Sequence, residues 1–144
     1  MKKLLSSILV ALFVFSLNLS AQTITGNWKT IDDETGDAKS EVAIWKAEDG
    51  MYYGKIMKIY DETKKDNSCT KCDPEDARYN QKIIGMKIVM NLQKTGKNEW
   101  SKGTILDPNN GKVYKCKMWV EGNDLKLRGY IGPFYRTQTW HPIK

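Results

Sequence analysis

Two cysteines stand close together near the middle of the chain, in the sequence NSCTKCDPEDARYN. The spacing of Cys69 and Cys72 suits three kinds of chemistry: metal binding, redox exchange between thiols, and a disulfide that closes a short loop. The other candidates for such chemistry are one further cysteine, Cys116, and a single histidine, His141. The choice among these roles depends on the residues around the pair and on the compartment in which the protein works.

The residues that follow the pair give little support to a redox role. Residues 73–76 supply an N-cap aspartate, a proline in the first turn and two acids, so they predict a short helix over about 74–79. Thiolates are stabilised at the start of a helix, but this pair precedes the cap, and the neighbouring acids oppose a negative sulfur. The alternating strand and helix context of thioredoxin-like proteins is also missing.

A closed zinc site needs four ligands, and Cys69, Cys72, Cys116 and His141 would supply that number. However, Cys116 alternates with apolar residues, so we expect it to face the core, and the sequence has no second C-x-x-C pair. We therefore predict no metal site. The preferred interpretation is a local Cys69–Cys72 disulfide that fastens the base of a loop, with Cys116 as a buried free thiol.

The N-terminal residues bear on whether such a disulfide is stable. Two lysines precede an apolar run over residues 4–17, and Ser20 and Ala21 follow as small residues, which is the layout of a secretory signal peptide. The apolar run is shorter than the ~20 residues of a membrane-spanning helix, so cleavage after Ala21 is preferred to an uncleaved anchor. We expect a signal peptide over 1–21, a single domain over 22–144, no membrane span after cleavage, and a secreted or periplasmic protein in an oxidising compartment.

Charge and motifs exclude several classes of function. Loss of two lysines with the signal peptide lowers the formal charge from +6 to +4, and acids are interspersed with bases, so no nucleic-acid partner is predicted. The acidic run DDETGD over 32–37 lacks the spacing of a calcium loop and is interpreted as a solvated turn. The sequence has no G-x-S-x-G, H-E-x-x-H or phosphate-loop motif. We assign no catalytic residue and no cofactor, and we regard an enzyme as the less favoured class.

The residues after the expected signal peptide have the pattern of an all-β protein. Short runs rich in aromatic and β-branched residues alternate with turn sequences such as TGKN, DPNNG and EGND. Two runs, IGMKIVMNL and KVYKCKMWV, place Ile84, Met86, Ile88, Met90 and Leu92, and Tyr114, Cys116, Met118 and Val120, on one face each. The expected strands are 24–31, 40–47, 51–60, 84–92, 98–106, 112–120, 124–131 and 134–141. Tight hairpins favour an eight-stranded antiparallel up-and-down β-barrel with one long connection over 61–82, and a two-sheet sandwich is the alternative.

Two resemblances support this fold. Gly26-Asn27-Trp28 opens the first strand and Arg136 lies in the last, a pairing that resembles the calycins, the lipocalin and avidin group. The segments GNWKTIDDETGDAKS, CTKC, GTILDPNNGKVYKCKM and LRGYIG together with RTQTW are similar, in the same order, to a bacterial exported family catalogued as domain of unknown function 2147. That resemblance implies a calycin-like barrel in a periplasmic or secreted protein, and it implies no activity.

The barrel interior is the most suggestive part of the sequence for function. Eight-stranded barrels are filled by side chains or hold one small ligand. We expect the interior to include Trp28, Val42, Ile44, Met86, Ile88, Met90, Tyr114, Met118, Leu125, Leu127, Phe134 and Trp140. The leading hypothesis is a non-enzymatic binder of a small apolar or amphipathic molecule, held by Trp28, Met86, Met90, Met118, Phe134, Arg136 and Trp140. Arg136 would need a partner, either Trp28 or an acidic group of the ligand.

The second hypothesis is a structural or cell-envelope protein-interaction module with a filled barrel. Its contact patch would be formed by exposed aromatic residues opposite the buried faces, namely Trp45, Trp119, Tyr130 and Tyr135. A densely packed core would use the same interior residues as a ligand cavity, so the residues alone leave both hypotheses open.

Overall fold

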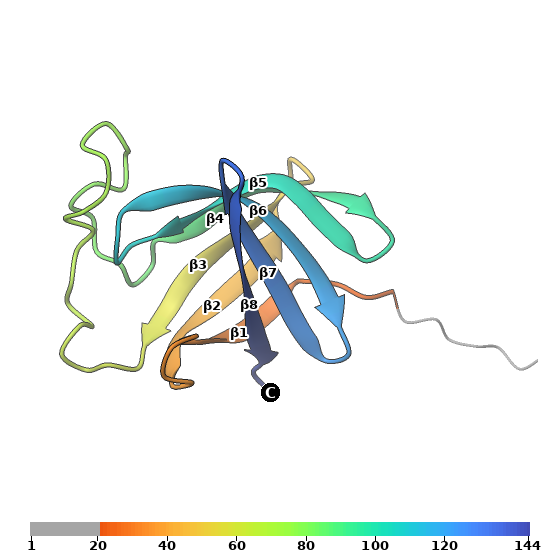
Figure 1. Cartoon of the computed structure of the whole chain (residues 1–144), viewed down its shortest axis with the longest axis horizontal. Helices are drawn as coiled ribbons and strands as arrows, with labels where there is room; N and C mark the ends of the chain where they lie inside the picture. The colour runs from red at the N-terminus through yellow and green to blue at the C-terminus, as the bar shows by residue number, and fades with distance from the viewer. Residues whose placement is uncertain (1–20) are drawn as a thin grey trace, which may run out of the picture.

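Eight β-strands follow one another along the chain in the computed structural model, which describes residues 21–144 (Figure 1). The expected signal peptide lies outside the described residues except for Ala21. The strands are β1 (Gly26–Ile31), β2 (Ala38–Lys46), β3 (Tyr52–Ile59), β4 (Lys87–Gly96), β5 (Glu99–Asp107), β6 (Lys112–Glu121), β7 (Asp124–Ile131) and β8 (Phe134–Pro142).

Each strand pairs antiparallel with the next, and the last returns to the first. β1 and β8 pair at Trp28 with Pro142, Lys29 with His141 and Thr30 with Trp140, which closes the sheet into a barrel. The eight-stranded up-and-down barrel expected from the sequence is therefore confirmed. Closure satisfies the backbone groups that the edges of an open sheet would leave unpaired.

The turns alternate between the two ends of the barrel because the strands run up and down in order. The connections β1–β2, β3–β4, β5–β6 and β7–β8 lie at one end, which we call the open end. The connections β2–β3, β4–β5 and β6–β7 lie at the other, which we call the closed end. The longest connection, the β3–β4 loop (residues 60–86), extends to one side of the barrel (Figure 1).

Large side chains fill the barrel toward its closed end. Trp100 is almost completely buried, and its ring meets that of Tyr52 edge to face with centroids 6.1 Å apart. Leu92, Leu125 and Met118 are fully buried in the same core cluster. Among the described residues the interior leaves a cavity at the open end.

The alternation expected for β4 is interrupted by bulges. Tyr52 pairs with Leu92 and Gly54 pairs with Val89, so between these two pairs β4 contains one residue more than β3. Asn91, within this bulge, adopts a left-handed φ of 57°. As a result Val89, which regular alternation with Ile88 and Met90 would place on the outer face, is completely buried. A Cβ on Gly54 would lie 3.1 Å from the Val89 side chain, so glycine leaves the space that Val89 fills.

Two further expectations for this region are corrected. Ile84 is exposed because β4 begins at Lys87 and not at residue 84. Residues 74–79 form successive turns and no helix. The backbone bonds join Asp76 N to Asp73 O and Tyr79 N to Asp76 O, and the Asp73 and Asp76 carboxylates accept from N–H groups two residues ahead. These local turns use the donors that a continuing helix would need.

Candidate ligand-binding cavity

A cavity of about 550 Å³ occupies the open end of the barrel. This volume lies within the range of pockets that hold small organic molecules. Its walls are largely apolar and come from all eight strands and the β3–β4 loop. The larger apolar residues are Ile31, Ile56, Ile59, Ile83, Ile88, Ile105, Leu106, Leu127 and Trp140. An apolar molecule placed here would exchange water for contacts with branched aliphatic side chains and one indole ring.

A pair of hydroxyl groups interrupts the apolar wall. Thr30 on β1 and Ser40 on β2 are opposite each other in the strand register, and their side-chain oxygens lie 2.7 Å apart. The Ser40 backbone N–H also donates to Thr30 Oγ1 at 3.1 Å. Both residues are buried and both line the cavity. A hydroxyl has more hydrogen-bonding capacity than this pair uses, so the cavity retains polar sites deep in its wall.

Gln138 adds a further polar group to the cavity wall on β8. Its Oε1 accepts a hydrogen bond from the indole nitrogen of Trp140 at 3.3 Å, which leaves the amide nitrogen as a donor. Tyr114 on β6 also lines the cavity, and its hydroxyl accepts from Asn110 Nδ2 at 2.9 Å. The interior thus combines an apolar surface with a few fixed hydrogen-bonding groups.

Charged residues of both signs surround the mouth of the cavity. Arg136 on β8 reaches the β1–β2 turn, where its Nε lies 2.8 Å from Asp33 Oδ2. Lys64 and Asp61 of the β3–β4 loop form a second pair at 3.3 Å. Asp32, Asp37, Lys39 and Asp107 also line the cavity, so its four acids and three bases nearly balance and do not select strongly for one sign of ligand.

The acids of the mouth are held in their ionised form by local hydrogen bonds. The backbone N–H groups of Thr35 and Glu34 donate to Asp32 and lower the pKa of its carboxyl group. The hydroxyl and backbone N–H of Thr63 likewise lower the pKa of Asp61. Neither acid is suited to accept a proton in a reaction near neutral pH.

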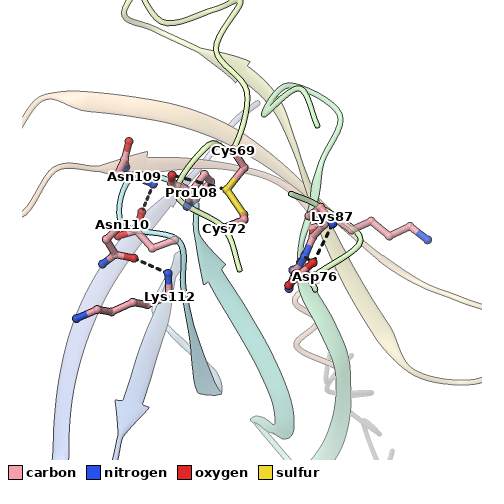
Figure 2. Close-up of a disulfide and its surroundings, with 10 residues drawn as sticks. Cys69, Cys72, Asp76, Lys87, Pro108, Asn109, Asn110 and Lys112 are labelled. Atoms are coloured by element: carbon pink, nitrogen blue, oxygen red, sulfur yellow. Dashed lines mark hydrogen bonds and ion pairs between the residues drawn. A yellow bond between two sulfur atoms is a disulfide. The ribbon is translucent and has the colours of Figure 1, made fainter. Parts of the chain in front are cut away.

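The Cys69–Cys72 disulfide expected from the sequence is present within the β3–β4 loop, beside the β5–β6 turn (Figure 2). Both cysteines are buried, and Cys69 Sγ lies 3.9 Å from the Pro108 carbonyl oxygen in the β5–β6 turn. Cys69 also exchanges backbone hydrogen bonds with Asn80 and Gln81 on the returning limb of the loop. The loop in turn supplies Asn67 and Ile83 to the cavity wall, so the disulfide helps to shape the mouth.

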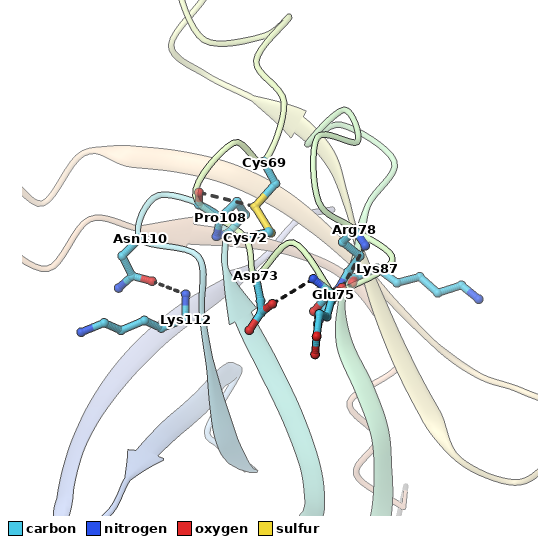
Figure 3. Close-up of polar contacts among 10 residues, drawn as sticks. Cys69, Cys72, Asp73, Glu75, Arg78, Lys87, Pro108, Asn110 and Lys112 are labelled. Carbon is cyan, nitrogen blue, oxygen red and sulfur yellow. Dashed lines mark hydrogen bonds and ion pairs between the residues drawn. A yellow bond between two sulfur atoms is a disulfide. The ribbon is translucent and has the colours of Figure 1, made fainter.

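Arg78 fastens the second limb of the loop to β4 by a hydrogen bond, and an ion pair within the loop holds its guanidinium in place. Arg78 donates from Nε and Nη2 to the Asp76 carboxylate at 2.9 and 2.7 Å, and from Nη1 to the Lys87 carbonyl at 3.1 Å. Figure 3 shows Arg78 beside Lys87, on the same side of the disulfide as Asp73 and Glu75. The guanidinium lowers the pKa of Asp76 to about 2. This short loop segment is therefore anchored by charge as well as by backbone contacts.

The seven residues expected to bind a ligand lie in several places. Arg136 and Trp140 line the cavity. Trp28, Met86 and Met118 are buried in the core and Met90 is half-buried, all outside the cavity wall, whereas Phe134 is 77% exposed. The β4 bulges explain the position of Met90, and the position of Phe134 beside the β7–β8 turn explains its exposure.

The contact considered between Trp28 and Arg136 does not form. Trp28 pairs with Pro142 near the end of β8, whereas Arg136 lies near its start, which separates them by ~20 Å along the strand. Trp28 instead donates its indole N–H to the Ile24 carbonyl at 2.9 Å, and Arg136 pairs with Asp33.

Most residues of the cavity wall were not among the ligand-binding residues predicted from the sequence. Thr30 and Ser40 share strand parity with the expected interior residues Trp28 and Val42, so alternation alone could have identified them. No comparable signal marks Asn67 or Ile83, because they enter the wall through the fold of the β3–β4 loop.

The other reactive side chains lie apart from the cavity and from one another. His141 Nδ1 lies 2.8 Å from Asp124 Oδ1 toward the closed end. Cys116 is a buried free thiol, and burial raises its pKa. Within residues 21–144, no three side chains of the metal-binding types gather at one point. None of the described residues forms a helix long and apolar enough to cross a membrane.

A closed eight-stranded up-and-down barrel with a cavity at one end is the architecture of lipocalin-like proteins. The chain belongs to the family described as "Uncharacterized protein conserved in bacteria (DUF2147)", which matches residues 26–142. Its fold is similar to that of a solved structure described as "Protein HP1028 from the human pathogen Helicobacter pylori belongs to the lipocalin family". That similarity has a TM-score of 0.73 and 20% sequence identity, over 85% of this chain and 84% of the other. No curated protein matches the chain.

Proposed function

We propose that this protein binds a small apolar or amphipathic molecule in the open end of its barrel and catalyses no reaction. The observation that carries the proposal is the cavity of about 550 Å³ with an aliphatic wall and a few fixed polar groups. Many ligand sites combine a mainly apolar lining with a small number of hydrogen-bonding groups that orient the ligand. The fold of a structure described as a lipocalin is consistent with this role.

The arrangement of the wall defines the chemistry of the ligand. The apolar body of the molecule would lie against Ile56, Ile88 and Leu127, and its polar group would meet Thr30, Ser40 or Gln138. The compensated charges at the mouth favour a neutral or weakly polar head group over a strongly ionic one. A hydroxyl or carbonyl group would suit the hydroxyl pair, because both can exchange hydrogen bonds with it.

The protein would act outside the cytoplasm, in the periplasm or after secretion. The disulfide supports this location because such bonds persist in oxidising compartments. The apolar N-terminal segment would direct export and would be removed after Ala21 to leave the domain over 22–144.

The cavity favours ligand binding over the filled-barrel interaction module. A module that uses only its outer surface has no need of an internal volume, and protein interiors normally pack without large voids. The empty volume at the open end is therefore the feature that separates the two hypotheses.

Native mass spectrometry of the protein exported by a bacterial host, purified without reducing agent, tests the proposal. We expect an organic adduct bound to a chain that carries the disulfide. The variant Ile59→Trp would place an indole in the mouth and remove the adduct, whereas Ile84→Trp, the same change at an exposed residue outside the cavity, would retain it. A wild-type protein without adduct that also fails to bind an added apolar probe would contradict the proposal.

A further inference from the structure

The tip of the β7–β8 hairpin exposes large apolar side chains. Every residue from Ile131 to Thr137 is exposed, in a short stretch that contains isoleucine, phenylalanine and tyrosine. Phe134 is 77% exposed and Tyr135 63%. Single exposed apolar residues are common, but a cluster of them at a protruding turn indicates a contact surface.

A neighbouring strand extends this cluster. Tyr130 pairs with Lys115 in the register of β6 and β7, which brings the start of β6 beside the turn. Val113 on β6 is also exposed. We call Val113, Ile131, Phe134 and Tyr135 the hairpin patch.

Basic side chains lie beside the hairpin patch on its β6 side. Lys112 and Lys115 are exposed and form no ion pair among the described residues. Arg128 on β7 lies over the Tyr135 ring at 4.6 Å and over the Trp119 ring at 5.3 Å. The sequence from Leu125 to Lys144 contains no acidic residue.

The acids nearest to the patch lie on other elements. Asp33 of the β1–β2 turn is paired with Arg136, and its turn also carries Asp32, Glu34 and Asp37. Asp107 pairs with Lys112 in the strand register of β5 and β6. On the side of the hairpin patch where Lys115 and Arg128 lie, the charge is therefore positive and has no acidic partner among the described residues.

We propose that the hairpin patch docks on an anionic phospholipid surface. Phe134 and Ile131 would enter the boundary between head groups and acyl chains, and Tyr135 would stay at head-group depth, where its ring is buried and its hydroxyl remains hydrated. Lys112, Lys115 and Arg128 would lie near the lipid phosphates. A protein partner is less suited, because a stable interface uses about 20–30 residues on each side and this patch is the tip of one hairpin.

Docking in this way would bring the cavity mouth to the membrane. The β7–β8 turn lies at the open end, and Gly129 and Arg136 of the same hairpin line the cavity. An apolar ligand could then pass between bilayer and barrel with little exposure to water. This consequence rests on the proposed function, whereas the docking itself does not.

Vesicle flotation of the exported protein tests the docking. The vesicles contain phosphatidylcholine either alone or with roughly 30% phosphatidylglycerol, which supplies the negative surface potential. We expect binding to the anionic vesicles that weakens with added salt. Phe134→Ser/Tyr135→Ser should lower the partition coefficient at least about 10-fold, and Lys112→Gln/Lys115→Gln should lower it roughly 10-fold to 30-fold.

Matched controls separate the hairpin patch from the rest of the surface. Met57→Ser removes an exposed apolar side chain on β3. Lys97→Gln/Lys102→Gln removes two positive charges near the β4–β5 turn, as many as Lys112→Gln/Lys115→Gln removes. Both control variants should bind the vesicles like the wild type. If Phe134→Ser/Tyr135→Ser still binds the vesicles, the proposal is overturned. The proposal is also overturned if the wild-type protein does not bind the vesicles and instead self-associates or binds another protein through this patch. The lysine variant should bind an apolar probe in the cavity normally, so failure of docking is distinguishable from failure of ligand binding.

Discussion

The hydroxyl groups of Thr30 and Ser40 lie 2.7 Å apart on the wall of the cavity, on two paired strands at the open end of the barrel. They are the two buried polar residues of the described core. A barrel built only for stability would gain from apolar residues at these positions, because a buried hydroxyl must find a partner. Their presence beside an empty apolar volume is consistent with a polar contact to a bound molecule.

The two hydroxyls should differ in their effect on stability. Thr30→Val removes an oxygen that faces both the hydroxyl and the backbone N–H of Ser40, so it leaves a buried donor unpaired and should cost about 1–3 kcal/mol. Ser40→Ala removes one side-chain bond and should cost about 1 kcal/mol. Urea unfolding of both variants checks the order, and a larger loss for Ser40→Ala would show that the hydrogen bonds are assigned incorrectly.

Loss of the disulfide should loosen the β3–β4 loop and leave the barrel folded. The closed ring is short, so Cys69→Ser/Cys72→Ser should lower the free energy of unfolding by only about 2 kcal/mol. Hydrogen exchange should increase over residues 60–86 and stay unchanged in β6 and β7. Cys116→Ala, which removes a sulfur outside the loop, is the control. Global unfolding of the serine variant would contradict the local role.

Gly111 and Gly122 provide a matched test of how closely the loop docks. Both adopt a left-handed φ, of 72° and 64°, so alanine should cost about 1–2 kcal/mol at either position. A Cβ at 111 would in addition overlap the Lys71 carbonyl, whereas one at 122 would meet no atom within 4 Å. Gly111→Ala should therefore be clearly more destabilising in thermal unfolding. Equal losses would mean that the disulfide loop does not rest on this turn.

Asp76 should contribute to stability only above acidic pH. Its pKa is lowered from 3.8 to about 2 by Arg78, so the ionised form stabilises the folded chain. The contribution is complete above about pH 4 and is lost as the pH falls toward 2. Asp76→Asn should cost about 1–2 kcal/mol at pH 7 and little at pH 2. Urea unfolding at the two pH values checks this, and a loss that does not change with pH would exclude the charge as its cause.

The strands could be predicted from the sequence because the signals for them are local. Turn residues and alternation mark β6, β7 and β8 within one or two residues, and tight hairpins fix their order. The bulges of β4 could not be read in this way. They depend on the pairing with β3 and on the space beside Gly54, which only the closed barrel defines.

The candidate site was predictable in kind but not in detail. Strand alternation predicted interior positions for Arg136 and Trp140, which line the cavity, and the Cys69–Cys72 pair was correctly interpreted as a disulfide. The partner of Arg136 could not be predicted, because Asp33 reaches it from a turn more than a hundred residues earlier in the chain. The wall formed by the β3–β4 loop also depends on docking against the β5–β6 turn, for which the sequence has no periodic signal.

Fluorescence titration with the uncharged apolar probe N-phenyl-1-naphthylamine tests most directly whether the barrel holds a ligand. Protein freed of any copurifying adduct should bind one probe molecule per chain and enhance its emission, and Ile59→Trp should weaken the affinity at least about 10-fold by filling the mouth. Ile84→Trp, at an exposed position outside the cavity, should bind like the wild type. No saturable binding by the wild type, or equal affinity in Ile59→Trp, would contradict the account.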